Sequence, residues 1–144
     1  MDNLSQFTDV LQDIMAERSL TVKDINAGSN IGINTINVWL QKTGTPSLNN
    51  LVRLSDYLKC SADYLTGRTD YNYFSERRIA TFAERLKSLM QERKISTRRF
   101  CADTNFSKSQ IYYFLNGKSK PNLNNLIRII DYFGCSLDYL IGRD

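Results

Sequence analysis

The stretch from Ile95 to Pro121, ISTRRFCADTNFSKSQIYYFLNGKSKP, predicts two short helices joined by a tight turn. Ser96 can cap the first helix, because its side-chain oxygen can accept an unpaired N–H group of the opening turn. Phe100 and Ala102 are then expected to face the core. Residues 103–105, Asp-Thr-Asn, interrupt the helical pattern, and asparagine tolerates a left-handed backbone better than most residues.

A second, amphipathic helix is predicted from its N-cap Ser107 to Leu115, with Ile111, Phe114 and Leu115 on the buried face. Its other face carries Lys108, Ser109, Gln110, Tyr112 and Tyr113, and the loop that follows contains Asn116, Gly117, Lys118 and Lys120. A helix that presents polar side chains and is flanked by cations suits the major groove of DNA.

An internal repeat decides the architecture of the whole chain. A shift of 75 positions aligns residues 7–68 with residues 82–143 without a gap, and 24 of these 62 paired positions are identical. The identical pairs include Leu11 with Leu86, Pro46 with Pro121, Asp56 with Asp131, Cys60 with Cys135 and Asp63 with Asp138. The chain is therefore predicted to be two copies of one small domain.

Each copy is expected to form five helices, and no strand pattern competes. The first helix is expected at about 4–18 in one copy and 75–93 in the other, and the second begins at Thr21 and Ser96. The third helix covers 32–40 and 107–115. The fourth ends near 58 and 133, and the fifth ends at Gly67 and Gly142. Asp63 and Asp138 fall in the first turn of the last helix, where a carboxylate favours that helix's own dipole.

The expected organisation is thus all-α, with a first copy at 1–69, a connector at 70–78 and a second copy at 79–144. Tyr71, Tyr73 and Phe74 are expected to pack, which would restrict movement between the copies.

Composition argues against several classes of protein. The chain of 144 residues is 42% hydrophobic, but no apolar run approaches a membrane span, and the amino terminus does not resemble a signal peptide, so we expect a cytoplasmic protein. Three cysteines without a CxxC pair fit neither a disulfide framework nor a zinc site. The chain has no histidine, no Gly-rich phosphate loop and no GxSxG motif. We therefore expect no catalysis, metal, cofactor or small-molecule ligand.

Charge is distributed unevenly between the two copies. Residues 1–75 contain 6 Lys and Arg against 8 Asp and Glu, a net charge of −2, whereas residues 76–144 contain 13 against 7, a net charge of +6. This asymmetry favours a polyanion as the partner of the second copy.

Two short helices, a proline, a fourth helix and the ending CSLDYLIGR at 135–143 together resemble the phage-repressor and Cro-like (XRE-type) family. The resemblance implies two tandem, five-helix, lambda-repressor-like helix-turn-helix domains that bind double-stranded DNA. It implies that base edges are approached by Lys108, Ser109, Gln110, Tyr112 and Tyr113. It places phosphates near Thr97, Arg98, Ser107, Asn116, Lys118 and Lys120.

The first copy departs from this pattern at its third helix. Its equivalent face consists of Ile33, Asn34, Asn37 and Val38, which include no cation and two aliphatic side chains. Phosphate contact is the main source of affinity and requires nearby Lys or Arg. This face is therefore expected to be a protein interface, for example in a homodimer, or a second and weaker DNA reader.

The sequence supports a main hypothesis and two alternatives. The main one is a repressor-like, sequence-specific transcriptional regulator whose second copy reads DNA while the first docks or dimerises. In one alternative both copies read DNA as an intramolecular pseudo-dimer. In the other, the fold is an antitoxin-type or anti-repressor-type protein-interaction module that does not use DNA.

Overall fold

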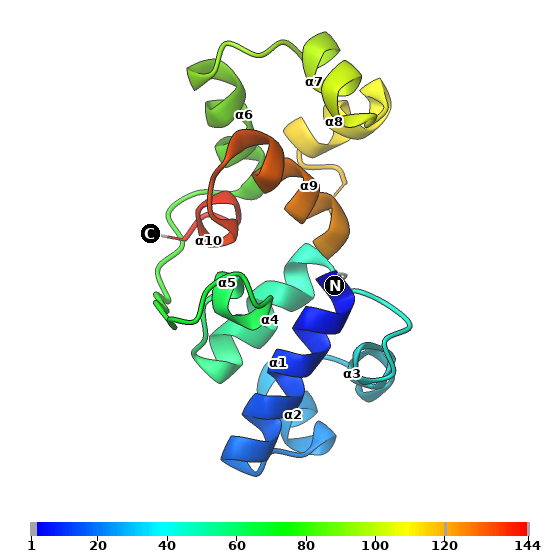
Figure 1. The fold of residues 1–144 in the computed structure, drawn as a ribbon, viewed down its shortest axis with the longest axis vertical. Coiled ribbons are helices and arrows are strands. Elements are labelled where there is room, and N and C mark those ends of the chain that lie inside the picture. Colours follow the sequence, from blue (N-terminus) through cyan, green and yellow to red (C-terminus); the bar gives the residue numbers. More distant parts are fainter. Residues whose placement is uncertain (1–2, 120, 144) are drawn as a thin grey trace.

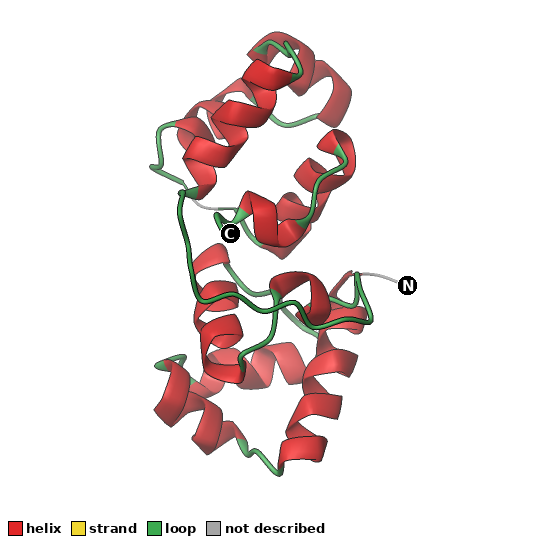
Figure 2. Cartoon of the chain, turned by 90° about the vertical axis from the view of Figure 1, so that its left-hand side faces the viewer, coloured by secondary structure: helices red, strands yellow, loops and turns green. Residues whose placement is uncertain are grey.

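The computed structural model describes residues 3–119 and 121–143, and all regular elements within these ranges are helices (Figure 1). This confirms the predicted all-α class. The two copies lie one above the other along the long axis of the molecule, as Figure 2 also shows.

Each copy contributes five helices in the same order. The first copy comprises α1 (Asn3–Arg18), α2 (Val22–Ser29), α3 (Ile33–Leu40), α4 (Leu48–Leu58) and α5 (Ala62–Leu65). The second comprises α6 (Phe82–Glu92), α7 (Thr97–Thr104), α8 (Lys108–Leu115), α9 (Leu123–Phe133) and α10 (Leu137–Leu140).

The first helix of the second copy begins later than its apolar spacing predicted. Helix α6 starts at Phe82 rather than near Ser75, because Thr81 forms a capping box with Glu84. The Thr81 side chain accepts from the Glu84 backbone N–H, and the Glu84 carboxylate accepts from the Thr81 backbone N–H. The residues before Thr81 are consequently free to run along the second copy, where the Ile79 N–H donates to the Gly142 carbonyl at 2.8 Å.

The repeat extends to the packing of the core. In the first copy the buried rings of Phe7 and Trp39 meet edge to face with centroids 5.6 Å apart. The equivalent rings of Phe82 and Phe114 meet in the same way at 5.8 Å. Helices α3 and α8 are therefore anchored to the first helix of their own copies by equivalent aromatic pairs.

Asparagine forms the turn before the third helix in both copies. Asn105 has a φ value of 64°, the left-handed conformation predicted for this turn, and the equivalent Asn30 adopts it too, with a φ value of 61°. Phe100 on α7 is buried as expected, but the expectation for Ala102 is wrong, since its side chain is exposed. Eight-residue α7 buries only a narrow stripe, and Ala102 falls outside that stripe.

The connector packs through only one of its three aromatic residues. Tyr71 and Tyr73 are 67% and 77% exposed, so the packing expected of them is wrong. Their rings contact each other, with centroids 5.8 Å apart. Phe74 is half-buried between the cations of Lys59 and Arg143, at 5.6 and 5.2 Å from its ring centroid.

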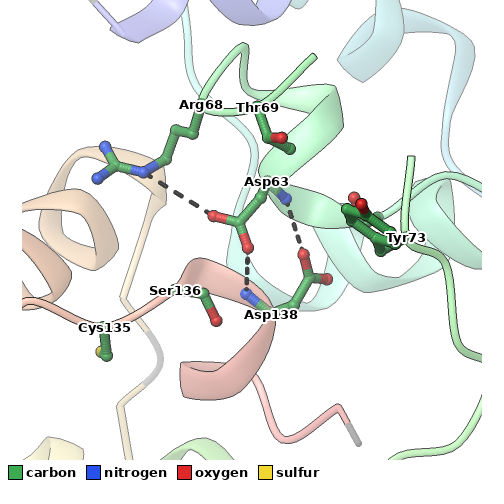
Figure 3. A pocket seen from close by; sticks show the side chains of 8 residues that line it. Asp63, Arg68, Thr69, Tyr73, Cys135, Ser136 and Asp138 are labelled. Atoms are coloured by element: carbon green, nitrogen blue, oxygen red, sulfur yellow. Dashed lines mark hydrogen bonds and ion pairs between the residues drawn. The ribbon is translucent and has the colours of Figure 1, made fainter. Parts of the chain in front are cut away.

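Asp63 and Asp138 lie in the first turns of α5 and α10, as predicted, but their side-chain hydrogen bonds go to the other copy. The Asp63 carboxylate accepts from the backbone N–H groups of Leu137 and Asp138, at 3.0 and 2.9 Å, and so caps α10. The Asp138 carboxylate accepts from those of Ala62 and Asp63, both at 2.9 Å, and so caps α5 (Figure 3). Each acidic residue therefore satisfies two backbone N–H groups at the start of the last helix of the other copy.

This exchange predicts a pH-dependent stability. Burial raises the pKa of Asp138 to about 6, and the neighbouring Asp63 carboxyl contributes to the rise. A raised folded-state pKa means that folding favours the protonated form, so this stabilisation is present near pH 4 and lost as pH rises through 6. We expect a lower free energy of unfolding at pH 7.5 than at pH 5 in urea titrations.

The control for this prediction is Asp138→Asn, in which this part of the pH dependence should disappear. The comparison is clean because the chain lacks histidine, the side chain that ordinarily titrates in this interval. Equal changes between pH 5 and pH 7.5 in the wild type and Asp138→Asn would contradict the assignment.

Candidate nucleic-acid interface

Helix α8 is fixed at its start by a capping box. The Ser107 hydroxyl accepts from the Gln110 backbone N–H at 3.0 Å, and the Gln110 side-chain carbonyl accepts from the Ser107 backbone N–H at 3.0 Å. Because Gln110 uses its carbonyl oxygen in this way, only its amide group remains to donate outward. The capping box also orients the first turn of the helix, which contains Lys108 and Ser109.

The outward face of α8 is polar and aromatic, as the sequence predicted. Lys108, Ser109 and Gln110 are exposed, and Tyr112 and Tyr113 are 59% and 45% exposed. The two tyrosine rings meet each other edge to face at 5.8 Å. On the opposite side Ile111 and Phe114 are buried as predicted, and Leu115 is only half-buried against the core. The outward residues can therefore be changed without loss of core contacts.

The loop after α8 holds its backbone by local hydrogen bonds. The Asn116 side-chain oxygen accepts from the Lys118 backbone N–H at 3.0 Å, and the Tyr113 carbonyl accepts from the N–H groups of Lys118 and Ser119. The Lys118 side chain is exposed, and no described residue pairs with it. Lys120, a predicted phosphate contact, lies outside the described residues.

Two arginines lie near the start of α7, and only one of them forms an ion pair with a described residue. Arg98 is exposed and has no ion pair within the described part of the chain, while Thr97 beside it is half-buried. Arg99 pairs with Asp103 at 3.5 Å, and Asp103 also accepts from the Tyr132 hydroxyl at 2.6 Å. Of the two arginines, Arg98 is thus the one available to a phosphate.

The equivalent surface of the first copy carries fewer cations: Lys23 on α2, the counterpart of Arg98, is exposed and has no ion pair among the described residues, but α3 itself contains no Lys or Arg. Ile33 and Val38 on α3 are 40% and 38% exposed, Asn34 is exposed and Asn37 is half-buried. Lys42, just after α3, pairs with Asp9 on α1 at 3.4 Å. The face of the second copy is therefore more positively charged than the equivalent face of the first copy, in line with the net charges of the two copies.

The two helices that carry these faces lie on one side of the molecule. Helices α3 and α8 are on the right in Figure 1, α8 in the upper copy and α3 in the lower one, and the connector runs along the left. In Figure 2, turned so that this left side faces the viewer, the connector crosses in front of the helices.

A family model for the Cro/C1-type HTH DNA-binding domain matches residues 10–65 and, separately, residues 85–144. The chain belongs to the Cro/C1-type HTH family. The two matches coincide with the two copies and include both α2–α3 and α7–α8. A search of curated proteins and a search of solved structures gave no match.

Membership of the Cro/C1-type HTH family places both domains in a DNA-binding family. It confirms the predicted resemblance and the predicted tandem duplication. In this Cro/C1-type chain the assignment of individual base and phosphate contacts stays a prediction. Among residues 3–119 and 121–143, no helix combines the length and apolarity that a membrane crossing requires.

The sequence reasoning missed the residues that join the two copies, namely Asp63, Asp138, Arg68 and Arg143. Each pair is identical in the repeat, which was the available sign of a shared role. Identity alone did not indicate that their partners lie in the other copy of the Cro/C1-type domain.

Proposed function

We propose that this chain is a sequence-specific transcriptional regulator that acts by occupying its DNA site, without catalysis. The observation that carries the proposal is the exposed face of α8, a helix fixed by a capping box, whose first residue Lys108 and following loop residue Lys118 form no ion pair with any described residue. Occupation of a promoter excludes RNA polymerase, so repression is the outcome we propose.

The base-facing role falls to the first two turns of α8. Lys108 can donate to the O6 and N7 acceptors of guanine, and Ser109 can pair with several base edges. Gln110 would act only as a donor, since its oxygen is held by Ser107. Tyr112 and Tyr113 would contact a thymine methyl group or the backbone beside it.

Phosphate contacts would surround this helix. Lys118 after α8 and Arg98 at the start of α7 would supply charge, and Thr97, Asn116 and Ser107 would add polar groups, with Lys120 proposed from the sequence. The Asn116 oxygen is occupied by the Lys118 N–H, which leaves its amide group free to donate to a phosphate.

A test of the electrostatic part is the salt dependence of binding. Each phosphate contact contributes about 0.9 to the slope of log K against log salt. We therefore expect Lys118→Ala to lower the magnitude of that slope by about 0.9 in anisotropy titrations on duplex DNA. Thr43→Ala, the same position in the first copy, should leave the slope unchanged.

The proposal as a whole is tested by the same titration on the wild type from low to physiological salt. Specific binding should persist as salt rises, while binding to unrelated duplexes weakens more steeply. Failure to bind any duplex at low salt would reject DNA binding altogether.

One observation favours a second candidate function. Exposed Ile33 and Val38 form an apolar surface on α3, a helix that contains no Lys or Arg, and such a surface suits a protein contact better than a phosphate backbone. In this case the chain would be an antitoxin-type or anti-repressor-type interaction module, or a homodimer through α3. Ile33→Asp would then abolish assembly while duplex binding is absent or unaffected.

A further inference from the structure

The contacts between the two copies are reciprocal. Helix α5 contacts α10 and α4 contacts α9, so each copy uses the same two helices. The exchange of caps between Asp63 and Asp138 is the first reciprocal pair, and Figure 3 shows the two carboxylates facing each other's helices.

A second reciprocal pair is formed by arginine at the end of each copy. Arg143 reaches Asp56 on α4 of the first copy at 2.8 Å. Arg68 reaches Asp131 on α9 of the second copy at 3.0 Å. Arg68 corresponds to Arg143 and Asp56 to Asp131 under the shift of 75 positions, so these are the same ion pair formed twice.

A third reciprocal pair involves only the backbone. The Leu48 N–H donates to the Pro121 carbonyl at 3.2 Å, and the Leu123 N–H donates to the Pro46 carbonyl at 3.0 Å. These bonds lie on either side of an antiparallel bridge between Ser47 and Asn122. They join the segments that follow α3 and α8, and so link the positions of those two helices.

Three contacts in which residue i meets j and j meets i define an isologous interface, the arrangement of a two-fold symmetric dimer. Here both halves belong to one chain. The surface that would pair two separate copies is consequently already occupied, and α3 and α8 already lie on one side of the molecule (Figure 1).

We propose that a single chain binds one duplex as an intramolecular dimer and recognises two unlike half-sites, one through α8 and one through α3. This inference rests on the proposed DNA-binding function. The two half-sites would lie about one helical turn apart, roughly 10 bp, as for other paired recognition helices.

The chemistry of α3 identifies its half-site as A·T-rich. Exposed Asn34 and half-buried Asn37 can pair with the N6 and N7 groups of adenine, and exposed Ile33 and Val38 can contact thymine methyl groups. Lys42 is paired with Asp9, which leaves the exposed Lys23 on α2 as this half's counterpart of Arg98, so this half contributes base contacts and fewer phosphate contacts than the α8 half. The charged α8 half would supply most of the affinity for DNA. Because the α3 half would prefer a different base sequence, it would fix the orientation in which the protein binds the site.

The test combines stoichiometry with a footprint on a duplex selected by the wild-type protein. Native mass spectrometry should give one chain per duplex, and hydroxyl-radical footprinting should show two protected segments, of which one is A·T-rich. In Asn34→Ala, Asn37→Ala only the A·T-rich segment should lose protection, and circular dichroism should be unchanged because these side chains lie outside the core.

Two chains per duplex, a single protected segment, or an unchanged footprint in the double variant would each overturn the inference while leaving the proposed function standing. Absence of any duplex binding at low salt would overturn both.

Discussion

Replacing Lys108 and Tyr113 together by alanine is expected to weaken binding to the selected duplex by on the order of a hundredfold, since each good base contact contributes about 1–3 kcal/mol. Both side chains are exposed on α8 and lie opposite its buried face. Helical circular dichroism and the unfolding midpoint should therefore stay close to those of the wild type. Anisotropy titrations at constant salt would measure the loss.

The repeat supplies a matched comparison, Ile33→Ala with Val38→Ala, at the equivalent positions of α3. This pair removes apolar contacts and no charge, so we expect a reduction of less than about tenfold. Equal losses for the two double variants would contradict the assignment of α8 as the principal reader. Unchanged affinity in the α8 variant would contradict it more directly.

Arg143→Ala is expected to destabilise the chain by about 2–3 kcal/mol, because hydrogen bonds to a charged, buried group are among the stronger ones. The Arg143 side chain is 2% exposed and reaches Asp56, the Ser55 hydroxyl and the Ser75 carbonyl at 2.8, 2.9 and 2.8 Å. Its loss would uncouple the two copies and broaden the thermal transition. Differential scanning calorimetry would measure both effects.

Arg68→Ala is the matched control for Arg143→Ala. The same ion pair is formed by Arg68 with Asp131, but their side chains are 31% and 61% exposed. Solvent screens such a pair, so a loss of no more than about 1 kcal/mol is expected. If the two substitutions cost the same, burial of Arg143 would not be the reason for its contribution.

Much of the fold was predictable because its determinants are local. The left-handed turn at Asn105 and the cap at Ser107 each depend on a few adjacent residues, and both were expected from residue type. The pattern Thr-x-x-Glu at 81–84 was equally local, yet the apolar spacing around it led to a helix start that was too early. The capping box was the better indicator of the two.

The contacts between the copies could not be predicted in the same way. Asp63 has an acidic side chain in the first turn of its own helix, which is a sufficient local explanation for the residue. Its true partners are the N–H groups of Leu137 and Asp138, more than 70 positions away. Only the three-dimensional arrangement of the repeat distinguishes the two explanations.

The candidate DNA-binding site could be predicted from the sequence only in part. Exposure of the α8 face followed directly from its amphipathic pattern. The pairing of Lys42 with Asp9 and the use of the Gln110 oxygen in a cap depend on geometry. Both details narrow the set of groups that remain available to DNA.

The most direct test of the central claim is the selection of bound duplexes from a random DNA pool at low salt, with the wild type and the Lys108→Ala, Tyr113→Ala variant in parallel. DNA reading through α8 predicts a recurring motif for the wild type, part of which disappears in the variant. Recovery of no motif from the wild type, or of the same complete motif from both proteins, would contradict it.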